Sequence, residues 1–263
     1  MTRFTKIIVG TGVLALMLTG CGGNATVDGN DLNTITAGTL TVCSDTPYPP
    51  FEFDDPDSPI GFSGFDIDVI AAIAERLNLK TVVVVTDFNA LQSGVALAAG
   101  SCDVGASAMT ITEERRANID FSDPYYDSLQ SLLVSASSSV KDLSEMSGMR
   151  IGLQTGTTGE IYAQKNAPKE ASLVSFPTDA EMWLALQSKQ VDALLQDYPV
   201  NYQHVQDDPD YAIVGKYDTK EQYGFAAAKD QKKDLLKAIN AQLKEIRKDG
   251  TYDTIYAKYF GSI

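Results

Sequence analysis

The chain alternates short apolar runs with longer segments in which apolar residues recur every three or four positions. In the first half this pattern predicts strands at residues 40–43, 82–85 and 103–108, and helices at residues 66–77 and 88–99. Residues 82–85 are wholly apolar, as is typical of a buried strand in a parallel sheet. Helix 88–99 is expected to turn Leu91, Val95 and Ala98 inward and to end at Gly100.

The same order of elements recurs in the second half of the chain. Strands are predicted at residues 150–153, 173–176 and 191–195, and helices at residues 159–164 and 180–188. A strand at 223–228, a helix at 232–247 and an aromatic segment at 252–260 follow. This alternation predicts two small α/β lobes, each a mostly parallel sheet flanked by helices. Ligands of such sheets bind beyond the carboxyl ends of the strands, here directly after Cys43, Ala108, Leu153 and Leu195.

The N-terminus has the pattern of a secretory signal. Two cations, Arg3 and Lys6, precede an apolar run at residues 7–18. Twelve helical residues cover about 18 Å, less than the roughly 30 Å of a bilayer core, so a spanning helix is the weaker interpretation.

The end of this segment, Thr19-Gly20-Cys21, resembles the lipobox of bacterial lipoproteins, in which the cysteine is acylated. We therefore expect a signal peptide at 1–20, a lipid anchor at Cys21 and a flexible, polar tether at 21–38. The alternative is a free cysteine near an ordinary signal-peptidase site.

Composition excludes several classes of function. The 263 residues carry a formal net charge of -14, with a pI near 4.4, so the basic surface that nucleic acids require is missing. One histidine and three cysteines are too few for a Cys/His zinc site. A Ser-His-Asp triad would have to use His204, which we place on a surface helix without a role. No metal or cofactor is expected.

Cys43 and Cys102 leave two interpretations open. An exported protein favours a disulfide. However, Cys43 lies near the end of one predicted strand and Cys102 at the start of its expected parallel neighbour, about four residues out of register and so roughly 13 Å away. Two buried thiols are the favoured interpretation, and a disulfide remains the alternative.

Several motifs appear in an order that resembles one known family. They are the stretches 45–53 (DTPYPPFEF), 64–77 (GFDIDVIAAIAERL), 109–115 (MTITEER), 119–125 (IDFSDPY), 196–197 (QD) and 250–253 (GTYD). From about residue 38 to its end, the chain resembles the polar amino-acid-binding proteins of ABC importers, solute-binding family 3. The stretch 64–77 is the most specific match.

The resemblance implies an α/β, two-lobed, periplasmic-binding-protein-like fold of type II with two hinge strands. Lobe 1 is then discontinuous (39–126 and 223–263) and lobe 2 is 127–222, with crossings near 125–130 and 218–223. The expected function is that of a monomeric, membrane-anchored extracytoplasmic protein. It would capture a free amino acid by lobe closure and deliver it to an ABC permease in the membrane, without catalysis.

A zwitterion held between two lobes needs a cation for its carboxylate and an anion for its ammonium. Arg115 offers a planar, bidentate guanidinium that suits a carboxylate, although taken alone it reads as an exposed cation of a helical first turn. By resemblance the carboxylate site also includes Thr110, the backbone at Ala108, and the hydroxyl of Thr158 or Thr157. Asp197 is the expected acceptor for the α-ammonium. The resemblance also places Met109, Gln154 and Gln196 at the site.

The ligand side chain is expected to meet Asp45, Tyr48, Glu52 and Phe88, again by resemblance. Aromatic walls stack on aliphatic or cationic stems, and a carboxylate suits a cationic or amide tip. Arginine, lysine or ornithine is therefore favoured, then glutamine, whereas acidic amino acids would bury like charges together. Core packing is the alternative role for Tyr48 and Phe88.

One alternative belongs to another class, namely a dehydratase-like enzyme on the same scaffold. In it Asp45, Glu52 and Asp197 would act as acid or base.

Overall fold

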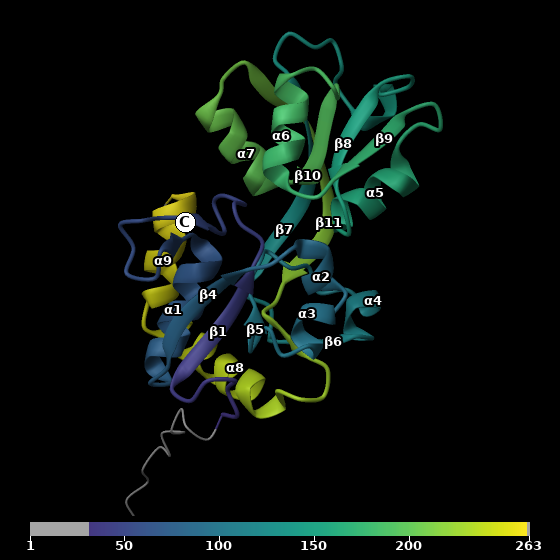
Figure 1. Ribbon diagram of the computed structural model, residues 1–263. Coiled ribbons are helices and arrows are strands. Elements are labelled where there is room, and N and C mark those ends of the chain that lie inside the picture. The colour runs from purple at the N-terminus through teal and green to yellow at the C-terminus, as the bar shows by residue number, and fades with distance from the viewer. Residues whose placement is uncertain (1–31, 262–263) are drawn as a thin grey trace, which may run out of the picture.

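The computed structural model describes residues 32–261 (Figure 1). The predicted signal peptide, Cys21 and the first part of the tether lie outside these residues. Among the helices of the described part, none is long and apolar enough to cross a membrane.

One sheet carries lobe 1. In spatial order its strands are β4 (Lys80–Val85), β1 (Thr39–Ser44), β5 (Val104–Gly105), β12 (Ala226–Ala228) and β6 (Ile119–Phe121). Strand β1 pairs in parallel with β4 and β5, whereas β12 runs antiparallel to β5 and β6. Only β12 runs against the rest of this sheet, so the carboxyl ends of β1 and β5 lie side by side at one edge.

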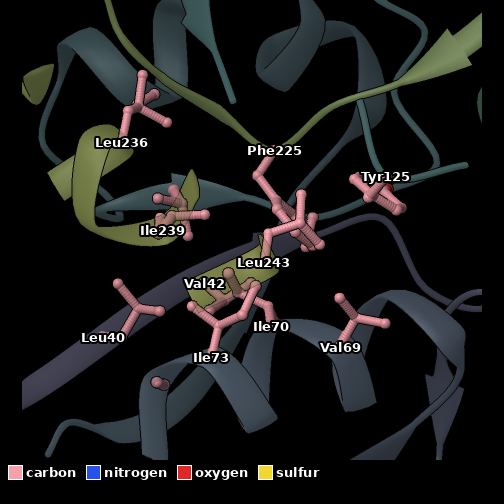
Figure 2. Close-up of a cluster of buried hydrophobic side chains, with 14 of the residues drawn as sticks. Leu40, Val42, Val69, Ile70, Ile73, Tyr125, Phe225, Leu236, Ile239 and Leu243 are labelled. Atoms are coloured by element: carbon pink, nitrogen blue, oxygen red, sulfur yellow. The ribbon is translucent and has the colours of Figure 1, made fainter. Parts of the chain in front are cut away.

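Helices cover both faces of this sheet. They are α1 (Phe65–Arg76), α2 (Phe88–Gln92), α3 (Val95–Ala98), α4 (Glu113–Arg116), α8 (Lys233–Lys248) and α9 (Thr251–Phe260), beside a hairpin of β2 (Phe53–Asp54) and β3 (Phe62–Ser63). Successive strand residues point to opposite faces. Val42 accordingly packs with Ile70 of α1 and Ile239 of α8 (Figure 2), and Cys43 packs with Leu91 of α2 on the other face.

A second sheet carries lobe 2. In spatial order its strands are β11 (Tyr211–Tyr223), β7 (Tyr126–Ser135), β10 (Ala193–Asp197), β8 (Arg150–Gln154) and β9 (Ser172–Phe176). The surrounding helices are α5 (Thr158–Asn166), α6 (Asp179–Gln187), α7 (Tyr198–Asp207) and the 3-10 turn η2 (Leu143–Glu145). Only β7 runs against the other strands of the sheet. The predicted two-lobed α/β fold with mostly parallel sheets is confirmed.

Strands β7 and β11 join the two lobes. They pair antiparallel from Tyr126 opposite Tyr223, beside lobe 1, to Ser135 opposite Tyr211, within the lobe 2 sheet (Figure 1). The pairing is interrupted between Tyr217 and Glu221, where β11 contains extra residues. The two chain crossings are therefore the two strands of one antiparallel ribbon, β7 and β11, which we call the hinge ribbon.

The expected single helix at 88–99 is wrong. The chain breaks at Gly94, whose φ of 83° is a left-handed conformation that favours glycine. A Cβ there would also lie 2.8 Å from a methyl group of Ile119. The break turns Val95 outward, to 64% exposure, and leaves Ala98 exposed, while Leu97 is buried.

The expected burial of residues 82–85 is also wrong. Strand β4 lies at the edge of its sheet, so Val82, Val84 and Val85 are exposed. An apolar run predicts a strand, but it does not show whether both faces of that strand are covered by other elements.

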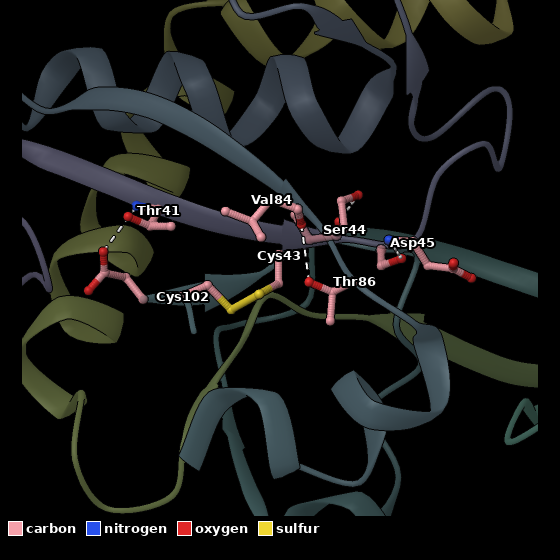
Figure 3. Close-up of a disulfide and its surroundings, with 10 residues drawn as sticks. Thr41, Cys43, Ser44, Asp45, Val84, Thr86 and Cys102 are labelled. Atoms are coloured by element: carbon pink, nitrogen blue, oxygen red, sulfur yellow. Dashed lines mark hydrogen bonds between the residues drawn. A yellow bond between two sulfur atoms is a disulfide. The ribbon is translucent and has the colours of Figure 1, made fainter. Parts of the chain in front are cut away.

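Cys43 and Cys102 form a disulfide, which corrects the favoured interpretation of two thiols (Figure 3). Their Cα atoms are 5.6 Å apart. The expected 13 Å assumed that Cys102 lies in an extended strand, but β5 begins only at Val104, and the chain bends at Asp103. The backbone N–H of Asp103 donates to the Thr41 carbonyl at 2.8 Å. The bend places Cys102 beneath Cys43 on the same face of the sheet.

The disulfide closes a separation of 59 residues, so it restricts the unfolded chain strongly. Replacing both Cys43 and Cys102 by alanine should lower the free energy of unfolding by roughly 2–4 kcal/mol, measured by denaturant titration. A protein that begins at residue 22 should show no reactive thiol in denaturant before reduction and two afterwards. Two reactive thiols before reduction would contradict the bond.

Candidate ligand-binding site

A narrow cavity lies between the lobes. It is formed at the carboxyl ends of β1, β5, β8 and β10, as expected for parallel sheets. Its lining residues come from both lobes: Asp45, Tyr48, Phe88, Ser107, Ala108, Thr110 and Arg115 from lobe 1, and Gln154, Thr157, Thr158 and Asp197 from lobe 2. All of these except Ser107 were expected at the site.

Three expected site residues lie outside the cavity. Glu52 is fully buried behind Ser107, whose hydroxyl donates to Glu52 Oε1 at 2.8 Å. Met109 packs in the core of lobe 1. Gln196 points into lobe 2, where its amide donates to Asp179 Oδ1 at 2.8 Å. Each of these three residues is next to a cavity-lining residue in the sequence or in the structure. The motifs therefore locate the site, but they do not show which side chains face the cavity.

Asp179 also contacts His204. The His204 ring lies 3.0 Å from Asp179 through Nε2 and stacks on Trp183 at 4.2 Å between ring centroids. His204 is on a helix of lobe 2, as expected, but it is buried, which corrects its placement at the surface.

The Arg115 guanidinium spans the two lobes. Its Nη1 donates to the Thr110 carbonyl at 2.8 Å, and its Nη2 donates to the Gly156 carbonyl of lobe 2 at 2.9 Å. The guanidinium lies over the Phe88 ring, 5.3 Å from its centroid. Burial lowers the pKa of Arg115 to about 10, so it stays a cation at neutral pH. Five N–H donors leave enough for a carboxylate in the cavity.

Asp197 faces the cavity from lobe 2. Its carboxylate accepts hydrogen bonds from Tyr223 Oη and Gln130 Nε2, both at 2.5 Å, and from Tyr48 Oη at 3.3 Å. Burial and then the charge of Glu221 raise its pKa to about 7. These donors are all neutral, so no cation within the described residues 32–261 pairs with the Asp197 carboxyl group.

Asp45 is the corresponding carboxylate of lobe 1. It accepts a hydrogen bond of 2.7 Å from Gln154 Nε2 across the cleft, and burial raises its pKa to about 6. The backbone N–H of Ala108, which we expected to face the ligand, instead donates to Asp66 Oδ2 at 2.7 Å. Ala108 therefore offers the cavity no free N–H group.

The structure distinguishes the two threonines that the sequence left open. Thr157 caps α5: its hydroxyl accepts from the Glu160 N–H at 3.1 Å and donates to the Gln154 carbonyl. The Thr158 hydroxyl lies 3.4 Å from that of Thr110 across the cleft. Thr158 is therefore the residue whose hydroxyl meets lobe 1.

Gln130, Glu221 and Tyr223, all from the hinge ribbon, adjoin the cavity without having been expected there. Together with Ser107 they are the residues that sequence reasoning missed. Ser107 directly precedes the expected Ala108, so the strand-end rule indicated its position. The hinge residues follow no strand end. The resemblance placed them in the chain crossings near 125–130 and 218–223, but no sequence signal indicated that their side chains adjoin the cavity.

Charge around the cavity is unbalanced. The Arg115 cation faces two lining carboxylates, Asp45 and Asp197, and the buried Glu221 lies just behind. Buried like charges repel one another. The arrangement therefore suits a ligand that brings at least one cationic group together with a carboxylate for Arg115.

Comparison with known proteins identifies the family of the chain. Residues 40–262 match the family model of bacterial extracellular solute-binding proteins, family 3, and the chain belongs to this family. It is 38% identical over 204 residues to the ABC transporter glutamine-binding protein GlnH of Bacillus subtilis (strain 168), a match that covers 74% of this chain and 72% of that protein.

Two solved structures are similar over most of the chain. An ancestral arginine-binding protein bound to glutamine is 38% identical, with a TM-score of 0.80, and the match covers 86% of this chain and 100% of that one. An ancestral amino acid-binding protein, described as a precursor of cyclohexadienyl dehydratase, is 35% identical with a TM-score of 0.77, covering 85% and 96%.

The raised pKa of Asp45 has a consequence for stability. A carboxyl group with a pKa near 6 in the folded protein and 3.8 in the unfolded chain favours folding less as pH rises between these values. Relative to the wild type, Asp45→Asn should therefore gain stability from pH 4 to pH 7, by up to about 3 kcal/mol. Denaturant titrations of both proteins across this range measure the difference.

Asp249→Asn is the matched control, because the pKa of Asp249 is shifted in the opposite direction. Hydrogen bonds from Thr251 and Arg76 lower the pKa of Asp249 to about 2, so this carboxylate stabilises the folded protein above the unfolded pKa. Its replacement should cost stability at neutral pH, and the loss should shrink as pH falls. A pH-independent difference for Asp45→Asn would contradict the burial of its carboxylate.

Proposed function

We propose that the protein is an extracytoplasmic receptor that captures one free amino acid between its lobes and delivers it to an ABC permease. The observation that carries this proposal is the pairing of Arg115 and Asp197 on opposite sides of one cavity. A fixed guanidinium suits the α-carboxylate, and the under-compensated carboxylate suits the α-ammonium. The receptor acts as a monomer, and it closes by rotation of lobe 2 (127–222) against lobe 1 (39–126 with 223–263) about the hinge ribbon.

The favoured ligand is a basic amino acid: arginine, lysine or ornithine. Three carboxylates, Asp45, Asp197 and Glu221, lie at or beside the cavity, against the single cation of Arg115 in its lining. A ligand with two cationic groups and one carboxylate balances these charges better than a neutral ligand does.

Glutamine is the second candidate, because one contact specifically favours it. The Gln154 side-chain amide already donates to Asp45 at 2.7 Å, so this carboxylate can recognise a carboxamide. The relative from Bacillus subtilis and the ancestral arginine-binding protein are both associated with glutamine.

We further propose that the protein has no catalytic activity. The likeness to a dehydratase precursor is the reason to test this, since Asp45 and Asp197 have the raised pKa values of acid–base groups. In our proposal both carboxylates bind ligand. Incubation with prephenate or arogenate should yield no aromatic product.

A thermal-shift screen against the twenty amino acids, ornithine and citrulline tests the function. Ligand at about a hundred times its Kd should add about 2.7 kcal/mol of stability, visible as a raised Tm. Arginine, lysine or ornithine should give the largest shift, and Asp45→Asn should reduce the preference for these over glutamine. If no amino acid shifts the Tm, even after unfolding and refolding to remove retained ligand, the receptor proposal fails.

The neighbouring arginines provide a matched pair of variants. Arg115→Ala should nearly abolish binding of every amino acid, because it removes the buried cation that faces the cavity. Arg116→Ala removes an exposed cation one residue away and should leave Kd within about twofold. Equal, mild losses from both would refute the assigned site.

We also propose, from the sequence alone, that Cys21 carries a lipid anchor. In the native host, the wild-type protein should fractionate with membranes, and Cys21→Ala should be released into the soluble fraction. The mature protein should carry acyl chains, detectable by its mass. An unmodified mass with a free Cys21 thiol would favour the ordinary signal-peptidase alternative.

A further inference from the structure

Glu221 lies where the hinge ribbon meets both lobes. Its Oε2 is 3.2 Å from the Thr110 hydroxyl of lobe 1 and 3.1 Å from the Thr158 hydroxyl of lobe 2. Its carboxylate also accepts from Gln130 Nε2 at 3.0 and 3.2 Å. The interrupted pairing of β11, with Lys220 at a φ of 57°, precedes this residue. Glu221 itself is buried and does not line the cavity.

Counting hydrogens fixes how the two hydroxyls are oriented. A carboxylate has no hydrogen to donate, and each hydroxyl has only one. Thr110 and Thr158 can each donate to Glu221, or one of them can donate to the other at 3.4 Å. In either arrangement both hydrogens are engaged, and neither is left for the cavity. The two hydroxyls therefore present only lone pairs to a ligand. Such hydroxyls accept from an ammonium group and cannot donate to a carboxylate.

Asp197 adds a third acceptor to these two. A carboxylate has about four lone-pair sites, and Tyr48, Tyr223 and Gln130 occupy three of them. Gln130 Nε2 lies 2.5 Å from Asp197 Oδ1 and 3.4 Å from the Thr158 hydroxyl, so these acceptors are grouped around one amide. Three acceptors match the three N–H bonds of an ammonium group.

We infer that Glu221 is a positioning residue for the ligand's α-ammonium. It turns the hydroxyls of Thr110 and Thr158 so that, with Asp197, they form a three-acceptor site. This inference rests on the proposed function, and it reassigns both hydroxyls from the α-carboxylate to the α-ammonium. Since one hydroxyl comes from each lobe, the acceptor set is complete only when the lobes are closed.

Glu221→Met tests the inference with little change in shape. Its thioether is only a weak acceptor, so the hydrogens of both threonine hydroxyls can turn toward the ammonium. Isothermal titration would compare L-arginine and L-glutamine with their counterparts that lack the α-amino group, 5-guanidinopentanoate and glutaramate. The variant should bind the amino acids on the order of tenfold or more weakly. The desamino compounds should change less than threefold.

Asp218→Asn is the control, because it removes one negative charge from the same strand at an exposed position. It should leave all four Kd values unchanged, and the ligand-free Tm of each variant reports folding. Equal weakening of amino acids and desamino compounds by Glu221→Met would overturn the inference, as would no weakening. A wild-type protein that binds neither amino acid would instead refute the proposed function.

A double-mutant cycle with Thr158→Val provides a second, independent measurement. If Glu221 acts through the hydroxyls, its replacement should have a several-fold smaller effect when the Thr158 hydroxyl is already absent. Strictly additive losses of affinity would contradict the inference that Glu221 acts through the hydroxyls.

Discussion

The burial of unbalanced charge between two lobes is the constraint on which the site depends. A guanidinium and several carboxylates lie out of water at one interface, where each requires a partner. Neutral donors hold Asp197, and burial raises its pKa to about 7 and that of Asp45 to about 6. The charged form of each carboxyl group therefore bears a cost of burial that a cationic group in the cleft would offset.

The fold makes this concentration of charge feasible. Parallel strands end at a common edge, so Asp45, which follows β1, and Thr110, beyond β5, reach the cleft from one rigid sheet. Asp197, at the end of β10, reaches it from the other sheet. Tertiary packing behind these ends is apolar, with helices on both faces of lobe 1. The polar side chains that line the cavity lie at the edge between the two lobes.

The sequence predicted the site residues that lie in motifs near strand ends. It did not predict the residues whose place at the site depends on tertiary structure. Asp45, Arg115 and Asp197 each lie in a motif near a strand end, and all three line the cavity. Glu221 depends on an irregular pairing in β11 that alternation of polar and apolar residues does not reveal. The disulfide was missed for a related reason: a bend before β5 invalidates a distance calculated from extended strands.

The Cys43–Cys102 bond also connects the site to the compartment in which the protein works. It fastens β1 to the segment that enters β5, on the face opposite α1, two residues before Asp45 (Figure 3). Disulfides persist in oxidising surroundings and are rare where thiols are kept reduced. The family to which the chain belongs is extracellular. In such surroundings the bond beside Asp45 forms outside the reducing cytosol, so this side of the cleft is cross-linked only where the family works.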